Sequence, residues 1–157
     1  MLKNRKILYV FILSILLSSC GFKKIDQNTN TVYLQDIDVV GQDRISYVLR
    51  NNISLISDEN GSKKYDVKVN IINKKTIKIK DKAGRVKRYS LNFTTNLTLI
   101  DLDTQREITR TFLNSADYDV NTSQSKTISS EKSASNGIVE KISEEIKNFI
   151  KLSVENK

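Results

Sequence analysis

The chain has 157 residues, a formal net charge of +8, no histidine and a single cysteine, and this length suits one domain with a modest core. Without histidine it lacks the commonest general base and a common metal ligand, and one thiol cannot form an internal disulfide. Because we find no serine–lysine or paired-carboxylate spacing that suggests a hydrolase, we expect no enzyme, no catalytic residue, no metal and no cofactor.

The first 19 residues have the three-part form of a secretory signal peptide. Lys3, Arg5 and Lys6 precede an apolar run over 7–17, and small residues follow this run. The run is too short to span a membrane unaided, because a spanning helix needs about 20 residues. We therefore expect residues 1–19 to be a signal peptide that is removed.

The segment Leu17-Ser18-Ser19-Cys20 resembles the lipobox of bacterial lipoproteins. The resemblance implies that Cys20 becomes the first residue and carries covalent lipid, and two or more acyl chains anchor a protein stably to a membrane. Gly21 stands where lipoproteins kept in the inner membrane tend to carry Asp. The resemblance thus implies the periplasmic side of the outer membrane. The alternative is a signal peptide in which the cysteine is incidental.

Residues 20–31 are polar and form the expected acylated N-terminus and tether, with one α+β domain over 32–157. The pattern VYLQDIDVV from Val32 predicts a strand with an irregularity at Gln35-Asp36, and Gly41 ends it. Asp43 is a candidate N-cap of an amphipathic helix that ends before 58–61. The apolar stripe of this helix is Ile45, Val48, Leu49, Ile53 and Ile56.

Alternation of apolar and polar residues predicts three more strands, which form an antiparallel meander. The first begins at Tyr65 and continues weakly through Ile79. A turn at 82–85 leads to the strand that we expect to be longest, from Tyr89 to Leu99. A second turn at 101–104 leads to a strand that starts at Ile108 and extends toward 120.

A helical stripe after Ser123 predicts the last element, which we expect to be one long helix; a break at Asn136-Gly137 is the alternative. The predicted order is β-α-β-β-β-α. A four-stranded, mostly antiparallel sheet with alternating faces must bury one of them. We therefore expect both helices to pack on the same face of the sheet.

This order, following a lipobox, resembles the LPS-assembly lipoprotein family LptE. The local likeness lies in Cys20-Gly21-Phe22, in LTLID at 97–101 leading to Arg106-Glu107-Ile108, and in ADYDV at 116–120 before a serine-rich helix entry. It covers nearly the whole chain after the cleavage site. The resemblance implies a plug that sits inside the LptD β-barrel, helps it assemble and takes part in delivering lipopolysaccharide to the outer leaflet.

Small uncharged polar residues alternate along the expected longest strand, on the side away from the helices. Because a barrel lumen is polar and buried charges cost more than uncharged groups, these residues are candidates to face the barrel. An ordinary solvated sheet face is the alternative. The barrel-facing candidates are Ser90, Asn92, Thr94, Asn96 and Thr98.

The positive charge is concentrated in one segment. Residues 74–88 hold eight lysines and arginines and one aspartate, a local charge of +7. Lysine and arginine can bind the phosphates of lipid A, with arginine best matched to phosphate geometry. The alternatives are a solvated surface, another anionic lipid, or acidic residues of the barrel. The lipopolysaccharide-binding candidates are Lys78, Lys80, Lys82, Arg85, Lys87 and Arg88.

Two other classes of function compete with this interpretation. The charge alone would fit a nucleic-acid binder, but the export signal argues against nucleic acid as a partner. Another periplasm-facing lipoprotein, such as an auxiliary subunit of a lipid-trafficking transporter, is the main alternative, because a small sheet with covering helices hosts many functions.

Overall fold

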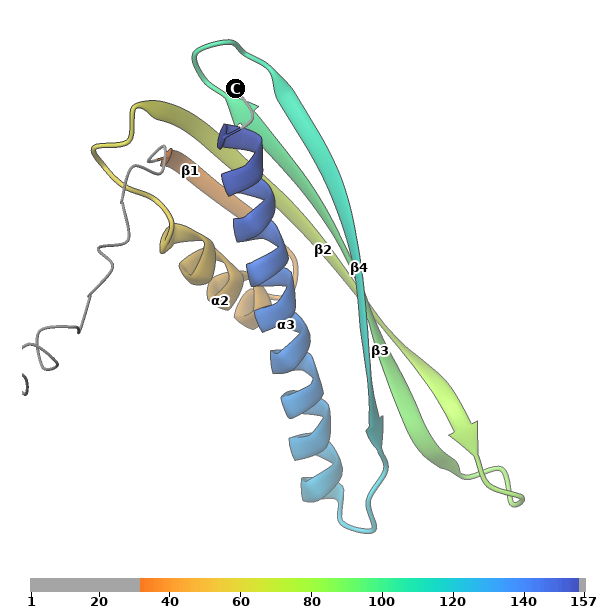
Figure 1. The fold of residues 1–157 in the computed structure, drawn as a ribbon. Helices are drawn as coiled ribbons and strands as arrows, with labels where there is room; N and C mark the ends of the chain where they lie inside the picture. Colours follow the sequence, from red (N-terminus) through yellow and green to blue (C-terminus); the bar gives the residue numbers. More distant parts are fainter. Residues whose placement is uncertain (1–31, 156–157) are drawn as a thin grey trace, which may run out of the picture.

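The computed structural model describes residues 32–155, which form one α+β domain with the predicted order β-α-β-β-β-α (Figure 1). The expected signal peptide, the lipobox, Cys20 and the tether lie outside the described residues. The elements are β1 (Val32–Val40), α2 (Asp43–Ser54), β2 (Lys63–Lys80), β3 (Val86–Asp101), β4 (Glu107–Asp119) and α3 (Gln124–Glu155).

The four strands form one sheet in the order β1-β2-β3-β4, with β1 parallel to β2 and the other pairs antiparallel. A register shift between Leu34 and Asp36 confirms the predicted irregularity of the first strand. The expectation that 89–99 belongs to the longest strand is wrong, because β2 has 18 residues and β3 has 16. Residues 72–80 of β2 are mostly polar, yet they continue to pair with β3.

Both helices cover the same face of the sheet, as predicted (Figure 1). Leu49 and Ile53 of α2 are fully buried, as are Ile146 and Ile150 of α3. They pack in one core with residues of β2 and β3, and burial of apolar surface is the main favourable term in folding. The buried sheet residues include Val67, Val69, Leu91, Phe93, Leu97 and Leu99.

Two details of α2 differ from the prediction. The N-cap is Gln42 rather than Asp43, which lies in the first turn, and the Gln42 side chain makes no capping hydrogen bond. Val48 belongs to the predicted apolar stripe but remains 38% exposed. It lies at the edge of the buried stripe, so the stripe is narrower than its sequence pattern indicates.

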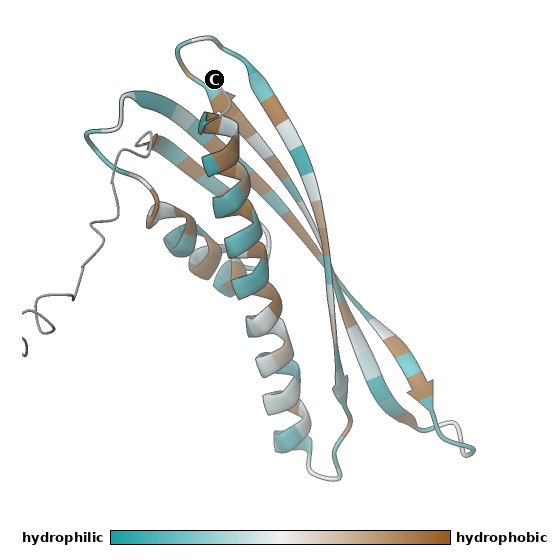
Figure 2. Cartoon of the chain, in the orientation of Figure 1, coloured by the Kyte–Doolittle hydropathy of each residue, from teal (hydrophilic) through white to brown (hydrophobic). Residues whose placement is uncertain are grey.

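The last helix runs without a break through Gly137, so the prediction of one long helix is confirmed. Its two halves differ in character (Figure 2). All seven of its buried residues lie from Ile138 onward, whereas the first half carries small polar residues. Within residues 32–155, no helix is both long and apolar enough to cross a membrane.

Both predicted hairpin turns are present, and an aspartate stabilises each. Asp81 accepts hydrogen bonds from the backbone N–H groups of Ala83 and Arg85 at the end of β2. Asp101 accepts hydrogen bonds from the backbone N–H groups of Asp103 and Thr104 in the second turn. Gln105 adopts a left-handed φ of 58° in the second turn, a conformation that costs a non-glycine residue free energy.

Candidate functional site: the open sheet face and the β2–β3 hairpin

The face of the sheet opposite the helices is open and polar. Burial alternates along β3, with odd-numbered residues 91–99 buried under the helices. The even-numbered residues of the same stretch therefore lie on the other face. These are the predicted barrel-facing candidates Ser90, Asn92, Thr94, Asn96 and Thr98, and all of them are half-buried or exposed.

Side-chain hydrogen bonds connect neighbouring strands across this open face. Thr111 of β4 donates from Oγ1 to Oδ1 of Asn96 over 2.9 Å. Asn92 donates from Nδ2 to Oγ1 of Thr76 on β2 over 3.1 Å. Because these side chains are short and hydrogen-bond to one another, the β3 strip of this face is polar and uncharged.

Two exposed aliphatic residues interrupt the polar face. Ile72 and Leu113 are the cross-strand neighbours of Thr94 on its two sides, and they are 56% and 75% exposed. Apolar residues surrounded by a polar rim are typical of contact sites for protein partners. Neither residue was predicted from the sequence as part of the site, although alternation with buried Ile71 and partly buried Phe112 places them on the open face.

Two of the predicted lipopolysaccharide-binding residues already pair with acids on β4. Lys78 forms an ion pair with Asp117, and Arg88 approaches Asp119 with 2.6 Å between Nε and Oδ1. The hydrogen bond from Lys78 lowers the pKa of Asp117, and the hydrogen bond from Arg88 lowers the pKa of Asp119. These two cations are therefore largely compensated within the chain.

The other four candidates lie around the tip of the β2–β3 hairpin, which curves away from α3 (Figure 1). Asp81 is 2.8 Å from Nε of Arg85 and 3.9 Å from Nζ of Lys87. The backbone N–H of Arg85, followed by its side chain, lowers the pKa of Asp81. Lys80 and Lys82 are exposed and have no acidic partner within residues 32–155.

The basic segment is therefore less positive in space than in sequence. Asp117, Asp119 and Glu131 join Asp81 as partners, so eight basic and four acidic residues leave a net charge of +4. The hairpin tip over 80–87 holds four basic residues and one acidic residue, a net charge of +3. The structure thus separates the six candidates into a tip group of four and a compensated pair.

Lys75 connects the sheet to the first half of α3. Its Nζ lies 2.9 Å from Oε2 of Glu131, and the hydroxyl of Tyr118 donates to the same oxygen over 2.8 Å. The ammonium also lies 4.6 Å from the ring centroid of Tyr89 and 5.4 Å from that of Tyr118, which allows cation–π attraction. We call Lys75, Tyr89, Tyr118 and Glu131 the Lys75 cluster.

Comparison with solved structures places this fold among bacterial lipoproteins. Rare lipoprotein B from Shewanella oneidensis aligns with a TM-score of 0.59 and 9% identity, over 77% of this chain and 97% of that one. A minor lipoprotein from Acinetobacter baumannii aligns with a TM-score of 0.54 and 12% identity, over 79% of this chain and 94% of that one. Lipoprotein B from Nitrosomonas europaea aligns with a TM-score of 0.52 and 16% identity, over 83% of this chain and 94% of that one.

These TM-scores show a shared fold, and at these low identities the likeness is one of fold alone. No family model matches the sequence, and no curated protein matches it.

The ionised form of Glu131 should stabilise the fold. Burial raises the pKa of Glu131, but the hydrogen bonds from Lys75 and Tyr118 outweigh it and leave the pKa below its ordinary value of 4.5. A carboxyl group with a lowered pKa stabilises the folded state above its ordinary pKa, and this contribution disappears as the pH falls through the lowered value. Glu131→Gln should therefore lower the free energy of unfolding at pH 7 by up to about 1 kcal/mol.

The measurement is urea unfolding of both proteins between pH 7 and pH 3. The difference between wild type and Glu131→Gln should begin to shrink below about pH 4.5 and disappear as the pH falls through the lowered pKa of Glu131, because the carboxyl group is then protonated and uncharged. Glu140→Gln, at an exposed position of α3, is the matched control and should show little difference at any pH. A constant difference for Glu131→Gln across this range would contradict the ionic role of the Lys75 cluster.

Proposed function

We propose that this chain is an outer-membrane lipoprotein that plugs and helps assemble an LptD-type β-barrel for lipopolysaccharide transport. The observation that carries the proposal is the β3 strip of the open sheet face, which is uncharged over 90–98 although the chain is rich in charge. The anchor is lipid on Cys20, and the domain faces the periplasm.

The lipoprotein part of the proposal has two independent supports. A basic, apolar and small-residue sequence ends in Cys20 at the position of a lipobox cysteine. The fold over 32–155 is shared with bacterial proteins that are described as lipoproteins and differ from this chain at more than four in five aligned positions. Gly21 favours the outer membrane over the inner membrane.

The barrel part of the proposal follows from the chemistry of the open face. A polar lumen can accept the hydroxyl and amide groups of β3 without the desolvation cost that buried charges would carry. Ile72 and Leu113 add two apolar contacts in the middle of this surface, where anchoring residues of interfaces usually lie. The neighbouring strand β2 carries charge on this face, because exposed Lys68 and Lys74 lie opposite Thr98 and Asn92. At the hairpin end, Lys78 and Arg88 form ion pairs with Asp117 and Asp119.

The hairpin tip supports direct contact with lipopolysaccharide. Lys80 and Lys82 are free of acidic partners in the described structure, and the Arg85 side chain is 76% exposed despite its contact with Asp81. Lipid A carries phosphates, and charge-assisted hydrogen bonds to phosphate are stronger than neutral ones. We assign the phosphate contact to the tip group, Lys80, Lys82, Arg85 and Lys87.

Site-specific photocrosslinking tests the barrel partner. A photoreactive amino acid at Thr94, in cells that express the full chain, should form one adduct with a large outer-membrane β-barrel. The same amino acid at Asn148, on an exposed position of α3, is the matched control. A Thr94 adduct with a transporter ATPase or a soluble periplasmic protein would instead support the transporter-subunit alternative, and equal adducts at both positions would contradict the role of the open face.

Charge reversal tests the lipopolysaccharide contact. Replacement of Lys80, Lys82, Arg85 and Lys87 by glutamate should raise the Kd for purified lipopolysaccharide at least about tenfold at low salt, because one lost charge-assisted hydrogen bond is worth about 1.5 kcal/mol. The effect should weaken at high salt, where screening already reduces binding. The measurement is titration of the full chain in mild detergent.

The matched control reverses four exposed lysines outside the hairpin tip and should change the Kd much less. If both sets weaken binding equally, the attraction depends on total charge and the tip assignment is wrong. Binding that the tip variant leaves unchanged would also refute the assignment. The control lysines are Lys64, Lys126, Lys132 and Lys151.

A further inference from the structure

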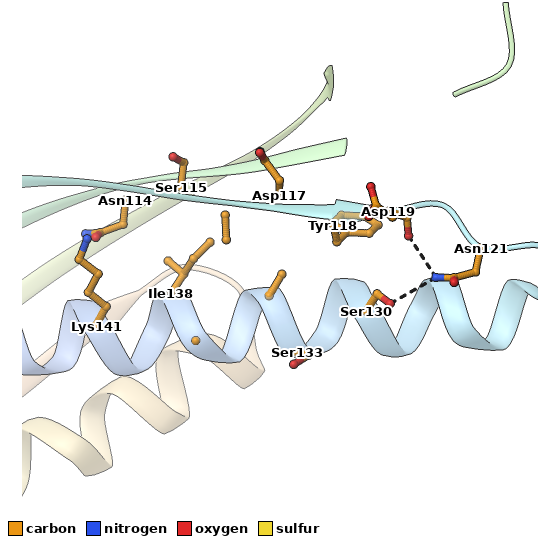
Figure 3. A pocket seen from close by; sticks show the side chains of 13 residues that line it. Asn114, Ser115, Asp117, Tyr118, Asp119, Asn121, Ser130, Ser133, Ile138 and Lys141 are labelled. Atoms are coloured by element: carbon orange, nitrogen blue, oxygen red, sulfur yellow. Dashed lines mark hydrogen bonds between the residues drawn. The ribbon is translucent and has the colours of Figure 1, made fainter. Parts of the chain in front are cut away.

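A groove separates the outer edge of β4 from α3 (Figure 3). Its volume is about 640 Å³, within the range of about 300–1,000 Å³ that is common for ligand sites. One wall is the stretch 114–119 of β4, which is the last strand of the sheet. The other wall is α3, through Ser130, Ser133, Ala134, Gly137, Ile138 and Lys141.

The outer edge of β4 presents backbone groups that bond to no partner in the part of the chain that the structure describes. Val120 donates its N–H to Lys87, and Asp101 donates its N–H to Arg106. Because hydrogen-bonded pairs alternate in an antiparallel ladder, the even-numbered residues of β4 bond to β3 and the odd-numbered ones point outward. The outward groups of 109–117 bond to no other element within residues 32–155.

One end of the groove is closed by a side chain. Asn121 donates from Nδ2 to the outward carbonyl of Asp119 over 3.3 Å and to Oγ of Ser130 over 3.4 Å, as the dashed lines in Figure 3 show. The carbonyl of Asp119 is therefore already occupied. The free edge begins at Asp117 and continues toward the start of β4.

The α3 wall of the groove consists mainly of residues with small side chains. Ser130 and Ala134 are four residues apart, as are Ser133 and Gly137, and each of these pairs is offset from the other by three, so the four residues share one side of α3. A Cβ added to Gly137 would meet no heavy atom within 4 Å. Glycine is unfavourable inside a helix, and no residue within 32–155 packs against the space that it leaves open.

A buried polar atom of the groove lacks a partner. Asn114 is 5% exposed and extends from β4 toward α3, beside Lys141 (Figure 3). Its Nδ2 donates to Oε2 of Glu145 over 2.9 Å, but its Oδ1 is buried without a hydrogen bond in the described structure. Buried acceptors are nearly always paired, so this oxygen is an acceptor that no donor within residues 32–155 satisfies.

We propose that this groove binds an extended peptide segment of a partner protein, which adds to β4 as a fifth strand. Main-chain hydrogen bonds to an exposed strand edge are a common way of binding peptides. The β4 wall over 114–119 is about 20 Å long at 3.4 Å per residue, and its edge is free over 114–117. The α3 wall from Ser130 to Lys141 spans about 17 Å at 1.5 Å per residue. The groove thus suits a segment of about six residues.

The charged residues of the groove are already paired within the chain, so we expect the groove to bind an uncharged segment. Lys78 compensates Asp117, Arg88 compensates Asp119, and Lys141 lies 4.0 Å from Glu145. The side chains that the segment turns toward α3 should be small or aliphatic, because they lie against the small side chains of the α3 wall. Those on the opposite side would extend the polar open face. This site does not depend on the proposed function.

Selection from a phage-displayed library of random decapeptides tests the proposal on the full chain in mild detergent. Gly137→Leu fills the groove, and leucine is the better helix former, so this variant should keep its fold; circular dichroism checks it. Asn136→Leu, which adds the same side chain at an exposed position that lines a different pocket, is the matched control.

Wild type and Asn136→Leu should enrich uncharged peptides with alternating aliphatic and polar residues, and Gly137→Leu should bind them at least tenfold more weakly. Hydrogen exchange of the β4 amides should slow when a selected peptide is added. Enrichment of no peptide, equal binding by Gly137→Leu, or unchanged exchange at β4 would overturn the proposal. Protection of β4 that rises with protein concentration alone would show that a second copy occupies the edge instead.

Discussion

The burial of one sheet face under α2 and α3 is the constraint on which the rest of the structure depends. Ile53 of α2 and Ile146 of α3 are fully buried, as is Leu99 of the sheet, and each buried side chain of this kind contributes about 1.5–3 kcal/mol. Because this one-sided core holds the domain together, the other face needs no apolar residues for folding. Its composition is free to serve contacts with a partner.

The same core ends halfway along α3, and this limit determines where binding features occur. The half of α3 that precedes Ile138 carries small polar residues. The Lys75 cluster, rather than apolar packing, connects this half to the sheet. The groove beside β4 opens along this half, and the hairpin tip curves away from it. Segments with few buried apolar contacts also open most easily in folded proteins.

Periodicity alone predicted the element order, the buried side of β3 and the continuity of α3. Periodicity could not predict contacts between residues far apart in the chain. Lys75 and Glu131 are separated by 56 positions, and Arg88 and Asp119 by 31. Because these acidic partners could not be predicted, the net positive charge of the basic segment was overestimated. The length of β2 was underestimated because strand pairing with β3 overrides the weak alternation of its polar end.

The central claim is that a partner covers the open sheet face where the protein works. The rate of maleimide labelling at Asn96→Cys, measured in the purified protein and in native membranes, tests it most directly. The exposed Asn148→Cys on α3 is the reference, and the wild-type chain gives the background from Cys20. We expect the Asn96→Cys thiol to react readily when purified and at least tenfold more slowly in membranes, relative to the reference. Equal relative rates in both preparations would contradict the claim.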